Sequence, residues 1–142
     1  MAVTTTVYGK AGMAFAAKQV DWVVDPVKMM LLADTYTFDK DAHALIGDVQ
    51  SHQITGTGYT AGGVGVQSRD VVYDAATDET WLRGTGILWS TATLTARYAV
   101  VYVDGTVKPL LACVDLGAPV SVTSGNLSMT FPSNVIVRMG AL

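Results

Sequence analysis

The chain has 142 residues, a formal net charge of −3, 50% hydrophobic residues and only 15% charged residues. This length fits one domain, residues 1–142, which can bury a core without a disulfide or a structural metal. The composition argues against nucleic-acid binding because there is no basic cluster, and against a membrane span because no apolar run reaches about 18 residues. Soluble domains carry about 25% charged residues, so we expect something else to cover part of this surface. The alternative is a monomer with a large core and a surface of threonine, serine and glycine.

The N-terminal part of the chain predicts an arm, a helix and a buried strand. Residues 1–6 include the β-branched run AVTTT, which we expect to form an extended arm that can pair with another chain. Residues 7–20 have apolar side chains at helical spacing and predict a short helix packed on a sheet. Residues 27–33, VKMMLLA, are short and apolar, which favours a buried strand. Residues 39–49 predict a short helix or turn, and residues 53–59 predict a strand.

A cluster of glycines follows in the segment GTGYTAGGVG. A phosphate-binding loop places such glycines between a strand and a helix, commonly before a lysine. Here strand-like residues follow the cluster and it contains no lysine, so it predicts a bend or bulge between strands. The glycines are Gly56, Gly58, Gly62, Gly63 and Gly65.

The C-terminal half predicts a series of antiparallel strands. Residues 69–73 and 79–83 are expected to form a hairpin around an Asp-rich turn. Residues 93–103, TLTARYAVVYV, are expected to be the central strand, entered from a short strand at 87–90 through a turn at 91–92. Asp104-Gly105 then signals a hairpin. The strands expected after it are residues 107–116, 120–123, 126–131 and 135–139, with breaks at residues 117–119 and 124–125.

Strands that recur about every 8–12 residues with turn signals between them indicate a mainly β fold. We expect an antiparallel β-sandwich or barrel, jelly-roll-like, with a short N-terminal helix. Arg97 interrupts the apolar central run, so its side chain is expected to face a sheet edge, a carboxylate or a partner surface.

The sequence contains no constellation that predicts catalysis, a metal site or a cofactor. His43 and His52 fit no metal-ligand spacing, and we expect them on a helix surface and in a loop. Cys113 lies in an apolar run and is expected to be a buried, unreactive thiol. We therefore expect a protein that is not an enzyme and binds no small-molecule substrate. Four acidic residues lack the glycine and glutamate of a calcium loop and predict a solvated face: Asp34, Asp39, Asp41 and Asp48.

Four segments resemble sequences from a group of small virion proteins of tailed bacteriophages. They are residues 21–31 (DWVVDPVKMML), 55–63 (TGTGYTAGG), 71–77 (VVYDAAT) and 95–102 (TARYAVVY). In that group, comparable segments occur in the same order after an N-terminal helix, and the likeness covers residues 8–116. These motifs are structural rather than catalytic. The resemblance implies a virion component encoded among head and tail genes.

The resemblance and the low charge together lead us to expect a capsid decoration (cement) protein on the virion, made in the bacterial cytoplasm. Its expected partners are the major capsid protein and copies of itself, with a trimer as the favoured state. Two alternatives stay open: a minor tail, neck or fibre-attachment protein, and a carbohydrate-binding β-sandwich that uses Trp22, Trp81 and Trp89. Apolar termini gain from burial on a neighbour. The candidate partner-contacting residues are therefore Ala2, Val3, Thr4, Thr5, Thr6, Arg97, Ala141 and Leu142.

Overall fold

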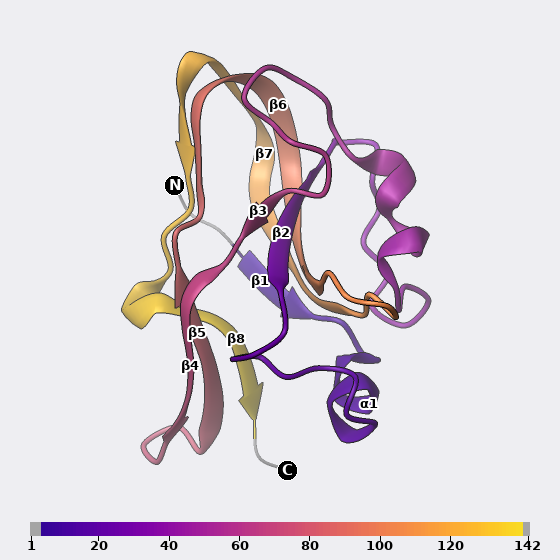
Figure 1. Ribbon diagram of the computed structural model, residues 1–142, viewed down its shortest axis with the longest axis vertical. Helices are drawn as coiled ribbons and strands as arrows, with labels where there is room; N and C mark the ends of the chain where they lie inside the picture. The colour runs from indigo at the N-terminus through magenta and orange to yellow at the C-terminus, as the bar shows by residue number, and fades with distance from the viewer. Residues whose placement is uncertain (1–3, 141–142) are drawn as a thin grey trace.

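The computed structural model describes residues 4–140, and this part of the chain is mainly β with one short α-helix (Figure 1). The strands are β1 (Thr4–Val7), β2 (Val27–Leu32), β3 (Val64–Gly65), β4 (Gln67–Asp74), β5 (Glu79–Thr85), β6 (Leu88–Val103), β7 (Leu110–Ser128) and β8 (Val135–Gly140). The helices are α1 (Ala11–Ala16) and the short 3₁₀ helices η1 (Ile46–Asp48), η2 (Gln50–His52) and η3 (Pro132–Asn134). The β class predicted from the strand spacing is confirmed.

The strands form two antiparallel sheets in a sandwich-like arrangement. The larger sheet has the order β1-β7-β6-β2-β3, and the smaller sheet has the order β4-β5-β8. In Figure 1 the smaller sheet lies to the left of the larger one, and the long strands β6 and β7 curve over at the top of the view. The predicted hairpin of β4 and β5 is present, with Tyr73 opposite Thr80.

Strand β6 is the centre of the larger sheet, as its composition predicted. Val100 pairs with Met30 of β2 on one side and with Cys113 of β7 on the other. Side chains such as Val101 enter the main hydrophobic core, whereas Val100 enters a second buried cluster that also includes residues of the 36–49 segment. Both faces of the strand are therefore covered, which explains why its sequence is apolar without alternation.

Three of the predicted strand breaks are wrong, because the chain continues as two long strands through them. The sequence predicted turns at residues 91–92, 117–119 and 124–125, but each lies inside β6 or β7. Thr91, Gly117 and Ser124 have φ angles of 49°, 85° and 46°, and the strand register shifts near these positions. Some β-bulges use a left-handed residue, as some turns do, so turn-forming residues here bend a continuous strand instead of ending it.

Two further elements differ from the prediction. Helix α1 covers only Ala11–Ala16 of the expected residues 7–20. Residues 53–59 do not form a strand, and only the isolated bridges at Gln53 and Thr57 remain. The Gln53 side-chain oxygen accepts hydrogen bonds from the Tyr59 hydroxyl and the Gly62 amide, both at 2.7 Å, and these bonds close the segment into a loop.

The expected N-terminal arm is in part a strand of the chain's own sheet. Thr4 pairs with Asp115 and Val7 pairs with Ala112, so β1 forms the edge of the larger sheet beside β7. Residues 4–6 are extended, as predicted, but they pair with β7 of the same chain instead of with another chain. Residues 1–3 of the predicted arm lie outside the described residues.

Candidate interaction surfaces and polar sites

The candidate partner-contacting residues fall into three groups. Ala2, Val3, Ala141 and Leu142 lie outside the described residues. Thr4 and Thr6 are exposed and Thr5 is half-buried, all on the edge strand β1. Arg97 lies on β6, which only β7 separates from this edge. Its guanidinium bonds Asp115 of β7, and Asp115 is the cross-strand partner of Thr4, so the structure brings Arg97 and the start of β1 to the same part of the sheet.

Arg97 is held by two carboxylates of its own chain. Its guanidinium lies 3.2 Å from Asp115 on β7 and 3.1 Å from Asp34 in the turn after β2, and it stacks over the Tyr98 ring at 5.2 Å. These hydrogen bonds, first with Asp115 and then with Asp34, raise the pKa of Arg97. Of the three environments predicted for Arg97, the structure shows the carboxylate. A partner would have to compete with this ion pair.

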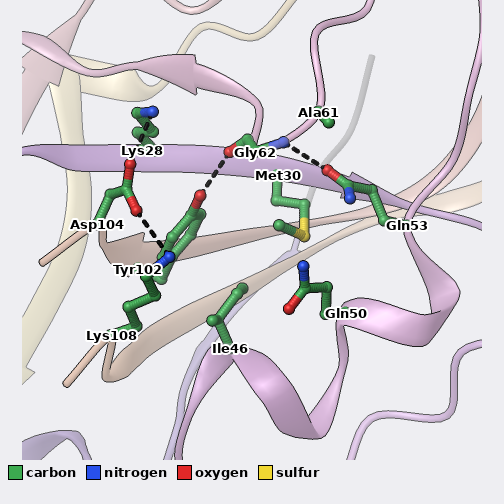
Figure 2. A pocket seen from close by; sticks show the side chains of 10 residues that line it. All are labelled: Lys28, Met30, Ile46, Gln50, Gln53, Ala61, Gly62, Tyr102, Asp104 and Lys108. Carbon is green, nitrogen blue, oxygen red and sulfur yellow. Dashed lines mark hydrogen bonds and ion pairs between the residues drawn. The ribbon is translucent and has the colours of Figure 1, made fainter. Parts of the chain in front are cut away.

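A polar pocket of about 260 Å³ opens beside β2 and the turn between β6 and β7 (Figure 2). Asp104 forms ion pairs with Lys28 at 2.8 Å and with Lys108 at 3.3 Å. The hydrogen bond with Lys28 is the largest influence on the pKa of Asp104 and lowers it. Across the pocket, the Tyr102 hydroxyl donates to the Gly62 carbonyl at 2.6 Å.

The polar groups of this pocket are largely directed at one another, as the dashed lines in Figure 2 show. Burial raises the pKa of Tyr102 to about 12, so its hydroxyl keeps its proton at neutral pH. One carboxylate between two ammonium groups makes a structural ion cluster, and it lacks the paired nucleophile and base of a catalytic site. The ion pairs and hydrogen bonds around this pocket therefore hold the glycine-rich loop and the β6–β7 turn against β2.

A second set of hydrogen-bonded polar side chains lies inside the second buried cluster, on the outer face of the larger sheet. The Tyr8 hydroxyl is 2.8 Å from the Tyr36 hydroxyl, which is 2.9 Å from Nδ1 of His43. Burial raises the pKa of both Tyr36 and the neighbouring Cys113 to about 12, which disfavours a reactive thiolate. Cys113 is buried, as predicted. Sequence reasoning missed this group because no motif links residues that are so far apart in the chain.

The histidine predictions need correction. His43 is half-buried in the turn before η1 rather than on a helix surface. His52 ends η2, and its Nδ1 lies 3.0 Å from the Thr35 hydroxyl. Within residues 4–140, no group of three His, Cys, Asp or Glu side chains could hold a metal ion. No helix in this range is long and apolar enough to cross a membrane.

The tryptophans are used for packing. Trp22 and Trp89 are 2% and 3% exposed, and the Trp22 indole donates to the Arg83 carbonyl at 2.9 Å. Trp81 is half-buried, with the Arg138 guanidinium 4.8 Å from its ring centre. A sugar-binding platform needs an open aromatic face, which the buried Trp22 and Trp89 do not offer.

Comparison with known proteins finds no match among protein-family models, curated proteins or solved structures.

Proposed function

We propose that this chain is a non-enzymatic structural protein of a tailed-bacteriophage virion, and that it decorates the capsid as a cement protein. The observation that carries the proposal is the ordered set of four segments that resemble small phage virion proteins. Their positions in the fold support it, because each segment holds the scaffold together.

The first two segments meet around β2. In residues 21–31, Trp22 anchors the approach to β2 through its hydrogen bond to Arg83. In residues 55–63, the glycine-rich loop passes so close to β2 that a side chain at Gly63 would collide with the Met29 backbone. The close approach of the two backbones requires glycine at position 63, and a motif that sets backbone geometry fits a structural protein.

The other two segments form a hairpin and the central strand. In residues 71–77, the Asp74 carboxylate accepts hydrogen bonds from the Thr77 amide and hydroxyl and closes the β4–β5 turn. Residues 95–102 lie in the doubly covered strand β6. A rigid β body with few charges suits a protein whose task is to clamp neighbouring subunits.

The proposed partners are the major capsid protein and further copies of this chain, with a trimer as the favoured oligomer. Contacts that are weak singly become strong when one oligomer binds several capsid subunits at once. This property lets a small protein stabilise a lattice without a large individual interface.

Binding to isolated phage particles tests the proposal. Purified protein is mixed with heads that lack it and, separately, with tails, and both mixtures are sedimented. We expect saturable binding to heads at a fixed ratio to the major capsid protein. Binding to tails or necks alone would instead support the tail alternative, and binding to neither would refute the proposal. Competition between a labelled sample of the protein and an excess of unlabelled protein is the control for non-specific adsorption.

A further inference from the structure

The charged residues of this chain are unevenly distributed. Residues 49–68, 84–96 and 116–137 contain no Asp, Glu, Lys or Arg. At the chain's average of 15%, segments of this combined length would carry about eight charged residues. The three segments are rich in threonine, serine and glycine instead.

The fold brings one part of each of these three segments together at one end of the molecule. Thr57 in the loop before β3 forms a bridge with Thr93 of β6. The Thr95 hydroxyl of β6 is 2.7 Å from the Ser121 hydroxyl of β7. The Ser124 amide donates to the Thr93 hydroxyl at 3.0 Å. This is the upper end in Figure 1, where β6 and β7 curve over beside the loop.

Short hydroxyl side chains cover this end, which we call the uncharged face. An open hollow of about 700 Å³ lies on it, and Leu94 and Val122 contribute apolar surface to its lining. The exposed residues that define the uncharged face are Thr55, Thr57, Thr93, Thr95, Ser121 and Thr123. The smaller sheet differs, because ion pairs such as Arg83–Asp70 and Arg138–Glu79 lie there.

We infer that the uncharged face is the surface through which copies of this chain associate. Around a rotation axis, the same residues of every copy gather near the axis, so a charge near the axis comes close to the same charge on another copy. Like charges placed opposite each other oppose association. A surface free of both signs avoids this repulsion, whereas a surface for a different protein gains from complementary charges. Charged residues are also depleted at the centres of protein interfaces.

The short side chains of the uncharged face also suit an interface between copies. A threonine loses little rotamer freedom when it is buried, compared with lysine, arginine or glutamate. Its methyl group can pack and its hydroxyl can bond across the interface. This inference rests on the proposed function for its expectation of an oligomer, but its test uses the isolated protein. The result of the capsid-binding experiment and the result of the self-association experiment can therefore be told apart.

Paired charge substitutions test the inference. One variant carries Thr55→Asp and Thr123→Asp, and a second carries Thr55→Lys and Thr123→Lys; both positions are exposed and line the hollow. Sedimentation velocity over a concentration series measures self-association. We expect wild-type protein to form oligomers, and each variant alone to associate at least about tenfold more weakly. An equal mixture of the two should associate more tightly than either, because opposite charges then meet.

The control places two acidic residues at the other end of β6 and β7. Thr106 and Val107 are exposed in the β6–β7 turn, so Thr106→Asp with Val107→Asp should leave self-association unchanged. Far-UV circular dichroism and urea unfolding establish that each variant is folded. If one of the two double variants does not fold, the variant with the opposite charge is compared with wild type instead. A wild-type protein that stays monomeric, or charged variants that associate as tightly as wild type, would overturn the inference. Weaker association of the control would also overturn it.

Discussion

Gly63 lies where the glycine-rich loop passes closest to β2, and its replacement tests whether the geometry of that motif maintains the fold. Its φ angle is +89°, which residues with a Cβ rarely adopt. A Cβ at this position would lie 2.0 Å from the Met29 carbonyl oxygen and 2.9 Å from the Met30 Cα. These are backbone atoms of a buried strand, so rotation of a side chain cannot relieve the collision.

The expected cost follows from two separable contributions. Holding alanine at such a φ angle costs about 1–3 kcal/mol. The collision forces a backbone shift that adds about 1–3 kcal/mol, as overpacking does in cores. Gly63→Ala should therefore lower the free energy of unfolding by about 2–6 kcal/mol, a large part of the roughly 5–15 kcal/mol of a typical domain.

Two neighbouring glycines separate these contributions. Gly62 has a φ angle of +96°, but a Cβ there would lie 3.5 Å from its nearest neighbour, the Tyr102 hydroxyl, so Gly62→Ala should cost only about 1–3 kcal/mol. A Cβ at Gly65 would meet nothing within 4 Å, so Gly65→Ala should change stability by less than about 0.5 kcal/mol. Urea unfolding followed by circular dichroism measures all three. If Gly63→Ala costs no more than Gly62→Ala, the predicted collision with β2 is wrong.

Three further results are expected. Cys113 in native protein should react with a thiol reagent only as fast as the protein opens, because burial raises its pKa to about 12; labelling as fast as that of a free thiol would contradict this. Trp22→Phe should lower the free energy of unfolding by about 1–3 kcal/mol, because the Arg83 carbonyl loses its indole donor. Trp81→Phe should cost less, because the half-buried Glu79 carboxylate that accepts from the Trp81 indole keeps its ion pair with Arg138. Equal losses in urea unfolding would count against the Trp22 anchor. The Lys28 and Lys108 ion pairs lower the pKa of Asp104 from its ordinary value of 3.8, so the stability they provide is present above that pH and is lost as the pH falls below it. Asp104→Asn should therefore be less stable than wild type at pH 7 and lose less stability on acidification, and identical acid profiles for the two proteins would contradict the linkage.

The sequence could predict which segments are strands better than it could predict where strands end. The apolar centre of β6 and the hairpin of β4 and β5 follow from local patterns, and both are present. The bends at Thr91, Gly117 and Ser124 were predicted as breaks because left-handed residues serve turns and bulges alike. Only the pairing of β6 with β7 along most of their length distinguishes the two, and local sequence does not contain that information.

The polar sites were less predictable than the strands. The sequence predicted a carboxylate as one of three possible environments for Arg97. It could not predict Asp34 and Asp115 as the partners, because they lie in a turn and a strand far from Arg97 in the chain. Tyr8 and Tyr36 bond each other across 28 positions of the chain, and neither stands in a recognisable motif. The β1 pairing was missed for a similar reason, since a short β-branched run indicates an extended backbone but not which chain it pairs with.

The copy number of this protein in purified virions tests the central claim most directly. Quantitative mass spectrometry with isotope-labelled peptides can compare it with the major capsid protein in intact particles, isolated heads and isolated tails. Capsid decoration predicts that the protein is in the heads, in a fixed ratio to the major capsid protein set by capsid symmetry. Its absence from the purified particles, or its presence in only a few copies confined to necks or tails, would contradict capsid decoration.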